Sequence, residues 1–163
     1  MKIPVVNEQD EIIGYKERAD RNPADIIRVS ALWLKNINGD VLLAQRAFRT
    51  RHGSGKWGMS ASGTVEEGET YEENMKKEAL EEIGFIVGEY TWGPKIKVQK
   101  DDYHYFLQIF VAVTDWSIDK FNIDSHEVEQ IKWYSSEELK EFVKNKDQIT
   151  TGFGQQTELF LNL

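Results

Sequence analysis

The chain has 163 residues and a mass of 18.9 kDa, which suits one domain with a buried core and leaves no room for two of ordinary size. With 40% hydrophobic and 29% charged residues, it belongs to neither the disordered nor the membrane class, and no run is long enough for a membrane span. The absence of cysteine excludes disulfides, thiolate metal sites and cysteine nucleophiles, and favours the cytoplasm. A formal net charge of -8 argues against a nucleic-acid polymer as partner, so an anionic substrate would need a cation to mediate its binding.

The first elements predicted along the chain are strands. Residues 3–6 and 12–15 predict a short β-hairpin around a polar turn. Apolar residues within 25–35, followed by turn residues, predict a strand that pairs with a second one at 41–45. Residues 46–56 are basic and contain glycine, so we expect an exposed loop there.

One predicted helix carries signals for both of its ends. Thr70 and Glu73 have the spacing of a capping box, and the helical pattern runs from there to Gly84, a typical C-cap. A second capped helix is expected at 135–143 and a short terminal helix at 155–161. The remaining elements are strands at 85–87, 91–99, 103–114 and 128–134, with a turn at 100–102. This order predicts a mixed α/β domain without regular βαβ alternation.

Acidic residues recur at fixed spacing on the first helix. The pattern is Gly63-x5-Glu69-x7-Lys77-Glu78-x2-Glu81-Glu82-x-Gly84-Phe85. Glu78, Glu81 and Glu82 lie within an arc of about 100° on a helix, where like charges repel unless a cation binds among them. Oxygen ligands without histidine or cysteine favour Mg²⁺ or Mn²⁺. The residues therefore point to a metal-dependent phosphate enzyme, with a solvated acidic helix face as the alternative.

This pattern resembles the signature of the Nudix hydrolases, Gly-x5-Glu-x7-Arg-Glu-aliphatic-x-Glu-Glu-x-Gly-aliphatic. It departs at Lys77, where the family usually has arginine, and Ala79 is small for the aliphatic position. An ammonium group would hold Glu69 or Glu81 with looser geometry than a guanidinium fork. The resemblance implies an α/β/α sandwich with a mixed sheet and an N-terminal hairpin. It makes the whole chain one Nudix domain, with a hairpin extension at 1–21 and the box at 63–85.

The resemblance also implies a site and an activity. The implied metal ligands for Mg²⁺, with Mn²⁺ as the other option, are Glu78, Glu81, Glu82 and a backbone carbonyl at Ser62 or Gly63. Glu69 would orient the helix through Lys77, and these two complete the implied catalytic set. The implied reaction is attack of water on the diphosphate linkage of a nucleoside diphosphate derivative or a similar small organic diphosphate.

Acidic and basic residues outside the box are further candidates. In the family a further carboxylate often serves as base or ligand, for which Glu127 and Glu129 are candidates. Asp124 and Glu127 could equally be ordinary loop acids. The basic loop before the box could clamp the diphosphate, and a solvated loop is the alternative. Its candidate substrate-binding residues are Arg46, which ends a predicted strand, Arg49, Arg51 and the additional Lys56. His52 in the same loop could equally be a bystander.

Several aromatic residues could stack a nucleobase, although most are expected in the core. They are Trp33, Trp92, Tyr103, Tyr105 and Phe106. Strand alternation places Tyr103 and Tyr105 on one face, and His104 is expected to be a satisfied strand histidine.

Two other functions compete with hydrolysis. Val5-Val6-Asn7-Glu8-x6-Tyr15 and the strand at 42–46 resemble the subgroup of isopentenyl-diphosphate isomerases and related Nudix hydrolases. That isomerase class uses a cysteine and histidines before the box, and residues 57–63 contain neither. The second rival is a Nudix domain that senses a nucleotide without turning it over, an option that Lys77 keeps open. The expected partner is a small-molecule diphosphate substrate, and no association with a membrane is expected. Whether the chain forms a homodimer is left open.

Overall fold

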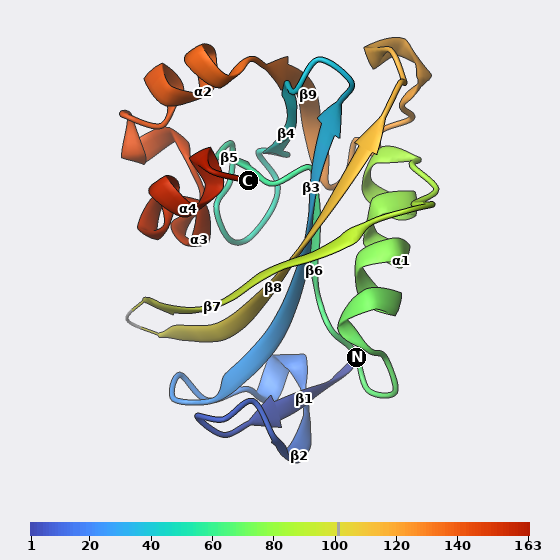
Figure 1. Cartoon of the computed structure of the whole chain (residues 1–163). Coiled ribbons are helices and arrows are strands. Elements are labelled where there is room, and N and C mark those ends of the chain that lie inside the picture. Colours follow the sequence, from blue (N-terminus) through green and yellow to red (C-terminus); the bar gives the residue numbers. More distant parts are fainter. Residues whose placement is uncertain (101) are drawn as a thin grey trace.

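The computed structural model describes residues 1–100 and 102–163, in which nine strands form one mixed sheet between two groups of helices (Figure 1). The strands are β1 Lys2–Val6, β2 Ile12–Glu17, β3 Ile26–Asn36, β4 Val41–Arg46, β5 Trp57–Gly58, β6 Ala61–Thr64, β7 Thr91–Lys100, β8 Tyr103–Thr114 and β9 Val128–Tyr134. The α-helices are α1 Tyr71–Ile83, α2 Ser136–Phe142, α3 Thr151–Gln155 and α4 Thr157–Leu161, and 3₁₀ turns occur at η1 Arg18–Asp20, η2 Ile118–Lys120 and η3 Lys146–Gln148.

The long strand β3 is the centre of the sheet. It runs parallel to β8, with partners from Ile26 and His104 to Asn36 and Thr114, and antiparallel to β1, β4 and β6. The strand β4 continues the sheet through β5 and β9, and β7 pairs with β8. Because β6 pairs Ser62 with Ala31 and Gly63 with Ser30, the start of the box is fixed on the sheet beside α1.

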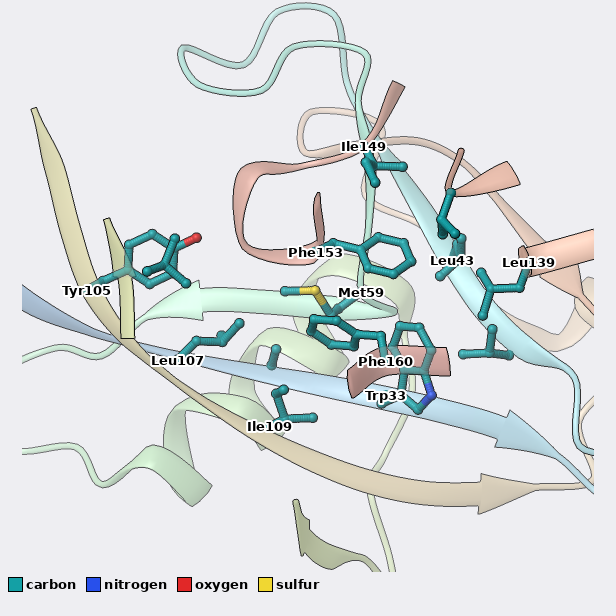
Figure 2. Close-up of a cluster of buried hydrophobic side chains, with 14 of the residues drawn as sticks. Trp33, Leu43, Met59, Tyr105, Leu107, Ile109, Leu139, Ile149, Phe153 and Phe160 are labelled. Atoms are coloured by element: carbon teal, nitrogen blue, oxygen red, sulfur yellow. The ribbon is translucent and has the colours of Figure 1, made fainter. Parts of the chain in front are cut away.

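The two faces of the sheet carry separate hydrophobic clusters. On one face, Met75, Ala79 and Ile83 of α1 are buried among residues of β3, β4 and β8. On the other face, α2, α3 and α4 cover the sheet. There Phe153 and Phe160 pack on Trp33, with ring centroids 5.6 and 5.0 Å away (Figure 2). This arrangement confirms the expected sandwich and packs α1 against β6.

The capping signals of both main helices are confirmed. Thr70 accepts a hydrogen bond from the Glu73 N–H, the Glu73 carboxylate accepts one from the Thr70 N–H, and Gly84 ends α1 with a φ of 67°. Ser135 and Glu138 form the same reciprocal cap on α2. A left-handed φ is unfavourable for residues with a Cβ, which explains why glycine ends α1.

Two sequence predictions differ from the structure, two short strands were not predicted, and one predicted turn falls partly outside the described residues. The strand predicted at 85–87 is wrong, because these residues form no strand and Phe85 is buried against the ring of Trp116 instead of pairing in the sheet. The short strands β5 and β6 were not predicted, since two to four residues with glycine give no clear alternation. The terminal helix predicted at 155–161 is two short helices, and the turn predicted at 100–102 includes Asp101, outside the described residues.

Candidate active site

A cleft of about 530 Å³ brings the box together with the basic loop. Carboxylates enter it from α1 and from the segment before β9, and cations enter it from the end of β4 and the loop that follows. Among the charged residues that line it are Glu78, Glu81, Glu82, Glu127, Arg46 and Lys56. The cleft thus holds acidic and basic side chains close together, as a site for an anionic substrate with a bound cation would require.

Glu82 is the most deeply buried carboxylate of the cleft, with 8% of its surface exposed. Its Oε2 accepts a hydrogen bond of 2.9 Å from the backbone N–H of Ser62, which fixes it against β6. Burial, reinforced by the charges of Glu78 and Glu127 and opposed by Ser62 and Arg46, raises the pKa of Glu82 to about 8. Without a cation, this carboxylate is therefore costly to ionise.

Glu78 lies one helical turn before Glu82, and its carboxyl group packs against the backbone of Gly63. A Cβ built at Gly63 would overlap this carboxyl group, so the absence of a side chain there makes room for it. Burial, partly offset by the Lys77 ammonium and reinforced by Glu81 and Glu69, raises the pKa of Glu78 to about 7. Two neighbouring carboxylates thus share an environment that disfavours their charged forms.

Lys77 holds the loop that precedes α1. Its Nζ lies 2.7 Å from Glu66 Oε1 and 2.6 Å from Glu69 Oε1, but 4.0 Å from Glu78 Oε1. The predicted pairing with Glu69 is confirmed, and the alternative pairing with Glu81 is replaced by Glu66. Burial would raise the pKa of Glu69, but hydrogen bonds from Lys77, the Glu66 N–H and Asn74 outweigh it and hold that pKa below its usual value. Lys77 therefore stabilises the charged form of Glu69, just before α1.

Asn74 is a positioning residue that the sequence analysis missed. It is fully buried, accepts a 2.6 Å hydrogen bond from Ser30 and donates to the Thr64 carbonyl at 3.0 Å. Its amide also lies 2.9 Å from Glu69 Oε2 and 3.4 Å from Glu78 Oε1. A buried asparagine one turn before Glu78 ties β3, β6 and the box together, and its only sequence signal is a polar residue beside the apolar stripe of α1.

The carboxylate oxygens of the cleft are the type of ligand that a divalent metal such as Mg²⁺ prefers. Glu78 and Glu82 are oxygen donors whose burial and mutual repulsion a cation would relieve, and the nearby ammonium of Lys77 is bound to Glu66 and Glu69. In the described part of the chain, however, no three histidine, cysteine, aspartate or glutamate side chains are already gathered as a metal site. The metal ligands named above, with Ser62 and Gly63, stay a prediction.

Of the remaining residues predicted for the site, some line the cleft and others lie outside it. Arg46 lines the cleft, its Nε bound to the His52 carbonyl at 2.9 Å, whereas Arg49 and Arg51 are not among its described lining residues. Arg49 instead lies 3.3 Å from His126. Among the candidate carboxylates, Asp124 and Glu127 line the cleft and Glu129 does not. Tyr103 and Tyr105 line it as well, while Trp33 is in the core and Trp92 and Phe106 lie elsewhere.

A family model for the NUDIX domain matches residues 26–153. The chain belongs to the Nudix family. Membership supports a hydrolase that acts on diphosphate, that is acid anhydride, bonds. A Nudix hydrolase of Deinococcus radiodurans is 32% identical over 96 residues, which are 57% of this chain and 55% of that protein. The chain therefore spans about half the length of that curated relative.

This Nudix domain is also similar to a second curated protein in sequence and to solved structures in fold. Isopentenyl-diphosphate Delta-isomerase 2 of Photorhabdus laumondii is 26% identical over 155 residues, 90% of this chain and 84% of that protein. A crystal structure from Deinococcus radiodurans has a TM-score of 0.79 at 22% identity, covering 97% of this chain and 98% of the other. The NUDIX domain of Shewanella oneidensis NrtR, complexed with ADP ribose, has a TM-score of 0.66 at 16% identity, covering 94% and 96%. At these identities the two structures show the fold, which confirms the predicted fold class.

Proposed function

We propose that this Nudix domain is a Mg²⁺-dependent hydrolase that cleaves the diphosphate linkage of a nucleoside diphosphate derivative or a similar small organic diphosphate. The observation that carries the proposal is the pair of neighbouring carboxylates, the buried Glu82 and the partly buried Glu78, in the same cleft as Arg46 and Lys56. Because the protein is acidic overall, a polyanion would bind most favourably where cations and a bound metal offset its charge.

Each side chain has a defined part in this proposal. Glu78 and Glu82, with Glu81 and a carbonyl of Ser62 or Gly63, would hold Mg²⁺ or Mn²⁺. When bound, the metal would polarise the diphosphate and lower the pKa of a water molecule. Arg46 and Lys56 would neutralise phosphate oxygens by charge-assisted hydrogen bonds.

Other residues would position this machinery or take up a proton. Lys77 and Asn74 both bind Glu69, and both lie beside Glu78. Together these contacts would keep the start of α1 in register with β6. Glu127 is the carboxylate outside the box that we propose as base, since it lines the cleft and its charge acts on Glu82.

The organic part of the substrate would lie against Tyr103 and Tyr105, which line the cleft with their rings 5.2 Å apart. A nucleoside or sugar would be a suitable group, because aromatic faces stack on bases. The bound ADP ribose of the Shewanella oneidensis domain supports a nucleotide derivative as the first compound to test.

The test is a panel of nucleoside triphosphates, sugar nucleotides, dinucleotides and prenyl diphosphates, each incubated with Mg²⁺ or Mn²⁺ and assayed for released phosphate and cleaved product. We expect at least one organic diphosphate to be hydrolysed only with metal present. Isomerised prenyl diphosphate as the sole product would contradict the proposal. Tight nucleotide binding without any turnover would identify a sensor.

The isomerase remains the second candidate because the Photorhabdus laumondii relative aligns over most of both chains. Against it, Trp57-Gly58-Met59-Ser60-Ala61-Ser62-Gly63 offers neither cysteine nor histidine. In the described residues, no helix is long and apolar enough to cross a membrane. The cytoplasmic location stays a prediction from composition.

A further inference from the structure

Two further cations line the cleft besides Arg46 and Lys56. Arg18, in η1 directly after β2, and Lys100, at the end of β7, both line the cleft. The family match begins at residue 26, so Arg18 belongs to a segment that lies outside it. The N-terminal hairpin therefore does more than extend the sheet, because it brings a cation to the substrate cleft.

The neighbours of Arg18 make this end of the cleft positive. The guanidinium of Arg21 lies 4.6 Å from the ring centre of Tyr103 and donates to the Asp102 carbonyl at 3.2 Å, which joins η1 to the β7–β8 hairpin. The ring of His52 stacks on Tyr103 with centroids 5.6 Å apart. Burial, together with Arg51, Arg18 and Arg21, holds the pKa of His52 below its usual value, against the opposing charge of Asp102. The charges of Arg18, Arg21 and Arg51 thus all act on His52, which lines the cleft.

We propose that Arg18, together with Lys100, binds an anionic group that the substrate carries in addition to its scissile diphosphate. The substrate class is then a small organic diphosphate with a further phosphate, either in the phosphate chain or on the sugar. This inference rests on the proposed function and makes Arg18 a specificity-determining residue.

Ion pairing within the same segment supports the assignment. Lys2 and Lys16 face carboxylates, with nitrogen to oxygen distances of 3.9 Å to Glu67 and 2.6 Å to Asp25. For Arg18 and Lys100, none of the carboxylates that the structure describes lies within 4.0 Å. In a chain with a net charge of -8, cations that line the cleft and have no described carboxylate within 4.0 Å are suited to an anionic ligand. Because both side chains are exposed, their contribution should be sensitive to salt.

The test compares ligands that differ by one phosphate: ADP with ATP, NAD⁺ with NADP⁺, and dephospho-coenzyme A with coenzyme A. Dissociation constants are measured by calorimetry in EDTA, and each ligand is checked to be intact afterwards. The proteins are wild type, Arg18→Gln, Arg18→Lys and, as a matched control outside the cleft, Lys2→Gln. The ATP pair reports a phosphate in the chain, and the other two pairs report a phosphate on the ribose.

We expect wild type to bind the member with the additional phosphate more tightly in at least one pair. Arg18→Gln should raise the dissociation constant of that member roughly 5- to 10-fold and that of the other member of the pair less than about 2-fold. The difference should shrink at high salt. Arg18→Lys should keep most of the affinity, and Lys2→Gln should change neither member. Equal weakening of both members, or no discrimination by wild type in any pair, would overturn the inference.

The outcomes separate this inference from the proposed function. Metal-dependent hydrolysis without discrimination at Arg18 would remove the inference alone. Discrimination at Arg18 without hydrolysis of any diphosphate would remove the proposed function and leave Arg18 as a binding determinant.

Discussion

The carboxyl group of Glu78 occupies the space where a side chain at Gly63 would begin. The box glycine therefore does not serve to turn the chain, since Gly63 lies within β6 and pairs with Ser30. It lets a carboxylate from α1 pack directly on a strand, and this close approach sets the distance between the helix and the backbone oxygens proposed as metal ligands.

Gly63→Ala should displace the Glu78 carboxylate and lower hydrolytic activity at least about 10-fold, while the free energy of unfolding changes by about 1 kcal/mol or less because the glutamate side chain can rotate away. Gly88→Ala is the matched control, since a Cβ there would meet nothing within 4 Å. Activity is measured as substrate cleavage, and stability by urea unfolding. Equal activity in the two variants would show that the placement of Glu78 is unimportant.

Substitution of Lys77 should change how strongly activity depends on metal. Lys77→Ala leaves Glu66 and Glu69 without their shared cation and should raise the Mg²⁺ concentration needed for half-maximal rate by about 10-fold. Lys77→Arg should keep or lower that concentration, because a guanidinium can bridge both carboxylates. The measurement is the hydrolytic rate of wild type, Lys77→Ala and Lys77→Arg as a function of Mg²⁺ concentration. Identical curves would reduce Lys77 to an ordinary surface residue.

Metal binding should also stabilise the folded protein. Adding millimolar Mg²⁺ or Mn²⁺ should raise the melting temperature, because the metal binds the native state in preference to the unfolded chain. Glu78→Gln should blunt this rise, whereas Glu89→Gln, an exposed residue after α1, should leave it unchanged. Thermal melts with and without metal give the comparison, and no rise up to saturating metal would argue against the site.

Asp10 offers a test of stability as a function of pH, away from the cleft centre. Its side chain is 8% exposed and accepts hydrogen bonds from Arg28 at 2.7 Å, Lys95 at 2.5 Å and Tyr71 at 3.0 Å. Burial raises its pKa, but Lys95 and Arg28 outweigh burial and hold the pKa below the usual 3.8. The ionised carboxylate thus contributes stability above about pH 4, and this contribution is lost as the pH falls through the folded-state pKa.

Asp10→Asn should therefore cost about 1–3 kcal/mol of unfolding free energy at pH 7 and progressively less below pH 4. Asparagine tolerates the φ of 62° at this position, so backbone strain does not confound the result. Urea unfolding at several pH values provides the measurement. A constant difference across that range would refute the electrostatic explanation.

Local signals predicted much of this fold. The capping boxes at Thr70 and Ser135 depend on neighbouring residues, so their helices were predictable from sequence. The pairing of β6 with β3 was not, because Ser62 and Gly63 show no alternation, and their place depends on residues far away in the chain.

The same distinction holds for the candidate site. Spacing on one helix predicted that Glu78 and Glu82 lie together, but the presence of Arg18 in the cleft depends on where the hairpin docks. The basic loop shows the limit of composition, since only the contacts of the folded chain separate Arg46 from Arg49 and Arg51.

The central claim is that the carboxylates of α1 serve metal-dependent cleavage of a diphosphate. Its most direct test is the rate of organic diphosphate cleavage by wild type, Glu82→Gln and the control Glu89→Gln at saturating Mg²⁺. Glu82→Gln should lose at least about 100-fold in rate and keep its fold, or gain slight stability without metal, because a buried charge is removed. Wild-type turnover in Glu82→Gln, or full activity of wild type in EDTA, would contradict the claim.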